Sequence, residues 1–97
     1  MDISQLRKQI DRIDEQILVL LTQRGQCALR IGQLKNEGNL SISNPDREVE
    51  IVKRLAGLNK GPLSIEDIGK IYKSIIKVCR KLQIENNSRH TDITECV

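Results

Sequence analysis

Arg24 points most directly to chemistry, because its position conflicts with the pattern around it. Apolar or nearly apolar residues recur on both sides of it in steps of three and four, at Ile3, Leu6, Ile10, Ile13, Ile17, Leu20, Cys27, Ile31 and Leu34. Position 24 falls on this stripe, where an apolar residue is expected. Burying a guanidinium without a partner is costly. We therefore expect Arg24 to face an anionic ligand, or a carboxylate such as Asp14 or Glu15 of a second helix.

Two further cations belong to the same helical pattern. Lys35 follows Arg24 by 11 residues, which places the two side chains about 20° apart around a helix and about 16 Å apart along it, so a ligand between them could contact both. Arg7 precedes Arg24 by 17 residues, or about 25 Å on a straight helix. If two such helices pair antiparallel in a dimer, the partner's Arg7 reaches the Arg24 site. Each cation also has a simpler interpretation. Lys35 could only complement the helix dipole near a C-terminus, and Arg7 could be an ordinary solvated surface charge.

The other candidates lie on two later segments. Arg47 and Glu48 fall in the first turn of an expected helix, and Cys79 and Gln83 are four residues apart, on one face of another. Surface charges in a first turn, and a small core residue at Cys79, are the simpler interpretations. Composition and spacing by themselves predict a helical dimer with a cation-rich interior pocket for a small dianion.

Three helices are expected to position these residues. The first covers residues 3–37, with a capping box of Asp2 and Gln5 and a stop at Gly38. After a loop at residues 38–43, the second begins at Asn44 and Pro45 and breaks within residues 57–62. Its expected apolar face is Val49, Val52, Leu55 and Ala56. The third follows Ser64, with a stripe of Ile65, Ile68, Tyr72, Ile75, Cys79 and Leu82. From about residue 86 the chain is polar and aperiodic, and we expect a flexible tail.

The length of the first helix predicts a second copy of the chain. A helix of 35 residues is about 50 Å long, whereas a compact chain of 97 residues is roughly 30 Å across. One chain cannot cover the apolar stripe of such a helix. The fold class we expect is therefore all-α, with three helices that form an intertwined homodimer through the long first helix.

Composition narrows the function classes. The net charge of +3 is too balanced to indicate nucleic acid, and Tyr72 is the only aromatic residue, so base stacking is not expected. The longest apolar run, residues 17–21, is too short for a membrane span, and no signal peptide is expected. Three cysteines and one histidine, His90, form no metal-like spacing. We expect a cytoplasmic protein without a metal site.

Five motifs in register resemble the all-helical (type II) chorismate mutases. They are Leu6-Arg7-x-x-Ile10-x-x-Ile13-Asp14, Leu20-Leu21-x-x-Arg24, Gly32-x-x-Lys35, Pro45-x-Arg47-Glu48 and Ile71-Tyr72-x-x-Ile75-Ile76-x-x-Cys79-x-x-x-Gln83. Each motif is weak, but together they cover about residues 4–84, and Lys35 and Arg47 have the twelve-residue spacing of the family. We assign residues 1–87 to a domain of this type and residues 88–97 to the polar tail.

The resemblance implies conversion of chorismate to prephenate in phenylalanine and tyrosine biosynthesis. This concerted [3,3] rearrangement needs no nucleophile, metal, cofactor or proton transfer. The enzyme holds the dianion in a compact conformer and stabilises negative charge on the breaking ether oxygen. By resemblance, Arg24, Lys35 and Gln83 are the catalytic residues, with Lys35 and Gln83 donating hydrogen bonds to that oxygen.

The resemblance also implies the remaining substrate contacts. Arg24 and the partner's Arg7 would bind the two carboxylates, so that the homodimer shares its active sites. Glu48 and the backbone at Asn44 would hold the ring hydroxyl, and Arg47 and Cys79 would line the carboxylate side. Asn44 and Cys79 depart from the commoner Asp and Ser of the family. Because a thiol is a weaker hydrogen-bond partner than a hydroxyl, the departure bears most on Cys79.

Three alternatives stay open at this stage. Isochorismate pyruvate lyase has the same fold but lacks the glutamate of the second helix, so Glu48 favours the mutase. A mutase of 4-amino-4-deoxychorismate differs only in the ring substituent that it binds. A non-enzymatic helical dimerisation module would have no reason to place Arg24 in an apolar stripe or to keep Gln83.

Overall fold

The chain forms three α-helices joined by two short connections. In a computed structural model, α1 spans Ile3–Glu37, α2 spans Pro45–Leu58 and α3 spans Ile65–Cys96. The structure describes the backbone of residues 1–96 and the side chains of residues 1–87. The predicted all-helical class, the three helices and the long first helix are confirmed.

The helices begin where local side-chain chemistry predicts. At the start of α1, the Asp2 carboxylate accepts from the Gln5 backbone N–H at 2.8 Å, and the Gln5 side chain accepts from the Asp2 N–H at 3.0 Å. Asn44 caps α2 and Ser64 caps α3, each by accepting a hydrogen bond from the N–H three residues later. These bonds satisfy backbone donors that have no partner inside the helix.

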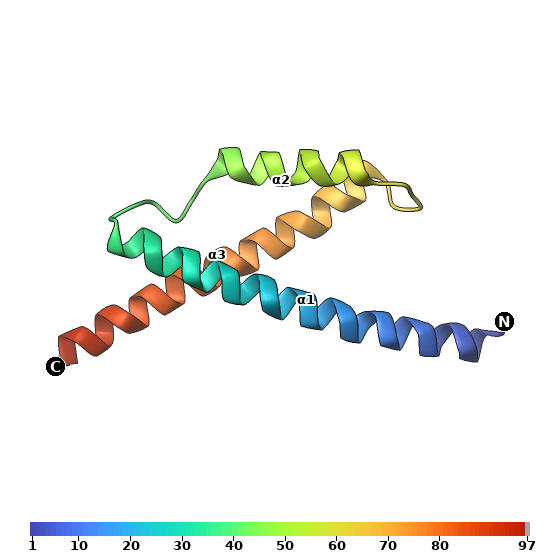
Figure 1. The fold of residues 1–97 in the computed structure, drawn as a ribbon, viewed down its shortest axis with the longest axis horizontal. Helices are drawn as coiled ribbons and strands as arrows, with labels where there is room; N and C mark the ends of the chain where they lie inside the picture. The colour runs from blue at the N-terminus through green and yellow to red at the C-terminus, as the bar shows by residue number, and fades with distance from the viewer. Residues whose placement is uncertain (97) are drawn as a thin grey trace.

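The third helix is the central element, because it packs against both α1 and α2. It crosses the C-terminal half of α1, and α2 lies along its first turns (Figure 1). The chain is elongated, with extents of 60 × 29 × 15 Å and a radius of gyration of 17.3 Å. A compact chain of this length would have a radius of gyration of about 12–13 Å, so the long helix is not wrapped by its own chain.

Much of the apolar stripe of α1 lies open in the single chain. Its N-terminal half extends beyond the other two helices (Figure 1), and its apolar side chains are exposed at Ile3, Leu6, Ile10, Ile13, Ile17 and Leu20. The buried apolar residues in the described part of the chain are Ala28, Ile51, Ile68 and Cys79. Ala28 lies on α1, Ile51 on α2, and Ile68 and Cys79 on α3.

The expected apolar face of α2 is wrong at Val49, which is 57% exposed, whereas Ile51 is buried. The face that meets α3 runs through Glu48, Ile51, Val52 and Leu55, a spacing of three, one and three that forms one side of a helix. Including Glu48 in this face turns a charged side chain inward. The predicted face is confirmed at Val52, Leu55 and Ala56, which are partly buried, and differs from the structure at Val49.

The third helix is also longer than expected. It continues to Cys96, beyond the end predicted near residue 86, and no glycine or proline interrupts residues 86–96. The side chains of residues 88–97 lie outside those that the structure describes, so the predicted flexible tail stays a prediction. Within the described residues, no helix has the length and apolar character needed to cross a membrane.

Candidate active site

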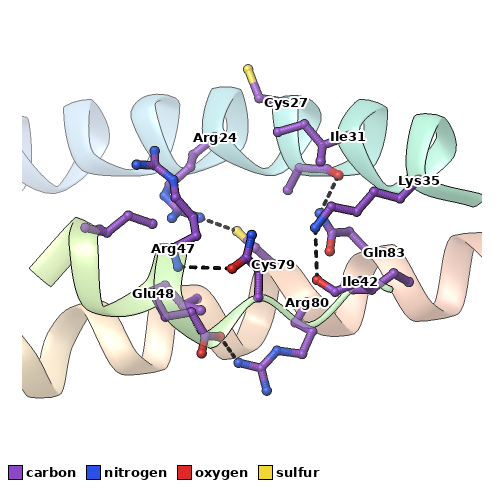
Figure 2. Close-up of a pocket in the computed structure, with 14 residues that line it drawn as sticks. Arg24, Cys27, Ile31, Lys35, Ile42, Arg47, Glu48, Cys79, Arg80 and Gln83 are labelled. Carbon is purple, nitrogen blue, oxygen red and sulfur yellow. Dashed lines mark hydrogen bonds and ion pairs between the residues drawn. The ribbon is translucent and has the colours of Figure 1, made fainter. Parts of the chain in front are cut away.

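All three helices contribute to one pocket, with a cavity volume of about 290 Å³ (Figure 2). Its apolar part is made by isoleucines of every element and by Ala28. The lining residues are Arg24, Cys27, Ala28, Ile31, Lys35, Ile42, Asn44, Arg47, Glu48, Ile51, Ile76, Cys79, Arg80 and Gln83. The structure thus brings together seven of the eight predicted site residues, from segments up to 59 residues apart in the sequence.

The pocket is electropositive. Four cationic side chains line it, namely Arg24, Lys35, Arg47 and Arg80. In the part of the chain that the structure describes, Glu48 is its only carboxylate. No group of three or more His, Cys, Asp or Glu side chains that could hold a metal ion occurs among the described residues. Such a site favours a small molecule with more than one negative charge.

Arg24 is held by Cys79 across the crossing of α1 and α3. Its Nη1 donates a hydrogen bond to the Cys79 sulfur at 3.0 Å, and Cys79 is buried. The second guanidinium nitrogen of Arg24 is not used in this contact. Arg24 lines the pocket, and its hydrogen-bond partner there is a thiol rather than a carboxylate. That Arg24 faces an anionic ligand stays a prediction.

Lys35 reaches the same pocket from the last turn of α1. Its Nζ donates to the backbone carbonyl of Ile42 at 3.2 Å, in the connection between α1 and α2. This bond uses one of three ammonium protons. The Asn44 side chain is occupied as the helix cap, where it accepts from the Arg47 N–H at 3.1 Å. At Asn44, which lines the pocket, the side-chain oxygen is therefore occupied by the cap, and the amide nitrogen is not part of that bond.

Gln83 is the most buried polar side chain among the described residues, at 9% exposure. Its Nε2 donates to the carbonyl of Ala28 on α1 at 2.8 Å. An amide NH₂ has two protons, so the bond to Ala28 fixes the amide plane and leaves the second proton for a ligand. The aliphatic part of the Gln83 side chain packs against Gly32 of α1. If residue 32 had a Cβ atom, it would lie 2.9 Å from Cγ of Gln83.

The two charged residues of the first turn of α2 differ in their partners. Arg47 lines the pocket and also forms an ion pair with Glu50 at 2.8 Å, in which both side chains are more than half exposed. Glu48 turns inward and forms an ion pair with Arg80 of α3 (Figure 2). Sequence reasoning missed Arg80. Its spacing to Ile76 and Gln83, four and three residues, was the available signal that it shares their helix face.

Arg7 is the one predicted site residue that does not line the pocket. It lies in the N-terminal half of α1, which extends away from α3 as a straight helix (Figure 1). The prediction that Arg7 and Arg24 of one chain cannot meet on one small ligand is consistent with this geometry. A contribution from the partner's Arg7 stays a prediction.

The fold and the site define an all-α protein of three helices with a cation-lined pocket where α1 and α3 cross. The family described as Chorismate mutase type II matches residues 6–84, and the chain belongs to this family. A solved chorismate mutase (Form II) of Thermus thermophilus is 40% identical and superposes with a TM-score of 0.82, over 84% of this chain and 92% of that one. The chorismate mutase of Helicobacter pylori, solved in complex with prephenate, is 34% identical, with a TM-score of 0.83, over 89% and 93%.

Curated relatives include proteins with one activity and proteins with two. The chorismate mutase of Methanocaldococcus jannaschii is 35% identical over 82 residues, which are 84% of this chain and 83% of that protein. A bifunctional chorismate mutase/prephenate dehydratase of Aquifex aeolicus is 44% identical over 86 residues. The match covers 84% of this chain but 24% of the bifunctional protein, so the chain spans about a quarter of that relative's length.

Proposed function

We propose that this chain catalyses the rearrangement of chorismate to prephenate. The observation that carries the proposal is the pocket, in which four cations and one buried amide surround a cavity of about 290 Å³. Family membership supports the same assignment. A concerted rearrangement of a dianion requires conformational restriction and charge stabilisation, and cationic and neutral donors supply both.

Lys35 and Gln83 stabilise the charge that develops on the ether oxygen as its bond breaks. Lys35 keeps two ammonium protons beyond its bond to Ile42, and Gln83 keeps one amide proton beyond its bond to Ala28. These donors are fixed before the substrate arrives, which is the condition under which charge stabilisation accelerates a reaction. Arg24 binds a substrate carboxylate through the guanidinium nitrogens that Cys79 leaves available.

The remaining contacts select the substrate. Glu48 and the backbone at Asn44 hold the ring hydroxyl, and Arg47 and Cys79 border the carboxylate side. Arg47 would leave Glu50, a change that costs little because both partners are largely exposed. The substituent on the ring is therefore recognised by α2, and the reacting ether by α1 and α3.

The active unit is a homodimer with two shared sites. This is supported by the open apolar stripe on the N-terminal half of α1 and by the elongated shape of the single chain. Antiparallel pairing of two α1 helices covers both stripes and brings the partner's Arg7 to the Arg24 end of the pocket. In such a symmetric dimer the apolar stripes of both α1 helices are covered, so neither stripe is exposed to bind a third chain.

The direct test is to incubate purified protein with chorismate, follow the loss of its absorbance and identify the product by chromatography. Formation of prephenate supports the proposal. Release of pyruvate from isochorismate, or faster turnover of 4-amino-4-deoxychorismate than of chorismate, would instead assign a related enzyme. Absence of turnover with all three substrates would leave a non-enzymatic dimerisation module.

A further inference from the structure

The ion pair of Glu48 and Arg80 joins α2 to α3 inside the pocket. Both residues line the cavity, and their side chains are 28% and 38% exposed, so the pair stands at the pocket wall rather than on the outer surface. Figure 2 shows Arg80 approaching Glu48 from the side opposite Arg24. The pair therefore borders the cavity while leaving its centre open.

Glu48 without a cation would work against the pocket. It is the only carboxylate in the described lining, and a dianion bound there would be repelled by it. Arg47 is the neighbouring cation in sequence, but its guanidinium pairs with Glu50. Lys35 donates to the Ile42 carbonyl, and Arg24 to Cys79. The cation that binds Glu48 in this structure is Arg80.

An arginine suits this role because its planar guanidinium holds a carboxylate in a fixed orientation and always carries its charge. A carboxylate has two oxygens with about four acceptor sites. Arg80 binds Glu48 Oε1, which leaves acceptor sites of Glu48 for a donor in the cavity. The pair thus presents an acceptor to the ligand with its negative charge largely compensated.

We propose that Arg80 is a positioning residue that aims the Glu48 carboxylate at the ring substituent of the substrate and offsets its repulsion of the substrate dianion. This inference rests on the proposed function, since it assigns Glu48 to the ring hydroxyl. Arg80 acts through Glu48, and its loss should therefore matter only while Glu48 is charged.

A double-mutant cycle tests this dependence with chorismate as the substrate. Arg80→Met removes the charge and keeps most of the side-chain stem, so KM should rise about tenfold, with a smaller effect on kcat. In the Glu48→Gln background, the same Arg80→Met change should alter KM less than threefold. Arg80→Lys, which restores a cation, should recover most of the affinity. An equal loss in both backgrounds would overturn the proposal, because Arg80 would then act independently of Glu48.

Lys81 provides the matched control. It is the next residue of α3, is 73% exposed, pairs with Glu85 and does not line the pocket, so Lys81→Met should leave KM unchanged. If circular dichroism shows that Arg80→Met does not fold, the KM of Arg80→Gln, which lacks the charge, is compared with that of Arg80→Lys, which keeps it. Equal KM values for these two variants would contradict the proposal. Absence of turnover by the wild-type protein would reject the proposed function. If the wild type is active and Arg80→Met has the same KM, only the role of Arg80 is rejected.

Discussion

Gly32 and Gln83 lie so close that a Cβ atom at position 32 would be 2.9 Å from Cγ and 3.0 Å from Cβ of Gln83. The contact joins α1 to α3 beside the hydrogen bond from Gln83 to Ala28. The Cβ and Cγ atoms of Gln83 therefore pack against the backbone of Gly32, and the Gln83 amide extends from there into the pocket. The absence of a side chain at Gly32 sets how closely α3 approaches α1 and where the Gln83 amide points.

Gly32→Ala should consequently reduce activity while the helices still form. The added methyl group must displace Gln83 or separate the helices, at a cost of about 1–3 kcal/mol, and we expect kcat to fall about tenfold or more. Gly57→Ala is the matched control, because nothing lies within 4 Å of its Cβ position. It should keep activity and raise stability by up to about 1 kcal/mol. Steady-state kinetics and thermal unfolding by circular dichroism measure both effects, and an unaffected Gly32→Ala enzyme would contradict the packing argument.

Lys35→Ala should lower kcat by at least about 10²-fold, or roughly 3 kcal/mol, because a cation aimed at developing charge is lost. Lys53→Ala, an exposed change on α2 outside the pocket, should have no effect. The measurement is kcat with saturating chorismate. A Lys35→Ala enzyme within threefold of the wild type would refute the role of Lys35 at the ether oxygen.

The pH profile reports on Gln83. An amide donates a hydrogen bond without titrating, so kcat/KM of the wild type should be nearly flat from about pH 6 to pH 8. In Gln83→Glu the replacing carboxyl must be protonated to donate, and its ordinary pKa is about 4.3. Activity of the variant should thus be greatest at low pH and decrease as pH rises through the pKa of that carboxyl. A steep profile for the wild type in the neutral range would count against Gln83 as the neutral donor.

Cys79 should contribute through Arg24. Cys79→Ala leaves the Arg24 Nη1 without its acceptor, and we expect KM for chorismate to rise about fivefold. This is the low end of the roughly 1–3 kcal/mol cost of an unsatisfied buried group, because Arg24 is only part-buried. Cys79→Ser supplies a stronger acceptor of similar size and should retain wild-type KM or improve it. Equal KM values for the alanine and serine variants would show that the thiol does not hold Arg24.

Shared active sites can be tested by mixing two inactive variants. Arg7→Ala and Arg24→Ala dimers should each be nearly inactive. After unfolding together in equal amounts and refolding, about half of the dimers should be mixed, each with one intact pocket in two, so about a quarter of wild-type activity should return. Mass spectrometry establishes that mixed dimers have formed. Their presence without recovered activity would exclude a pocket built from Arg24 of one chain and Arg7 of the other.

Local chemistry determined where the helices begin. The caps at Asp2, Asn44 and Ser64 act within three residues of sequence, so the sequence alone predicted where each helix begins. The three-and-four spacing similarly revealed the misplaced cation Arg24. These features depend on helix geometry, which is the same in every protein.

Only the tertiary structure decided how the helices face one another. Ile51 rather than Val49 is buried, on the face of α2 that also turns Glu48 toward Arg80, a contact between residues 32 positions apart. The approach of α3 to Gly32 likewise depends on where two helices cross. Periodicity identifies which residues share a face, but the rotation of each helix against its neighbour is set by the packing of all three helices together, which no local pattern contains.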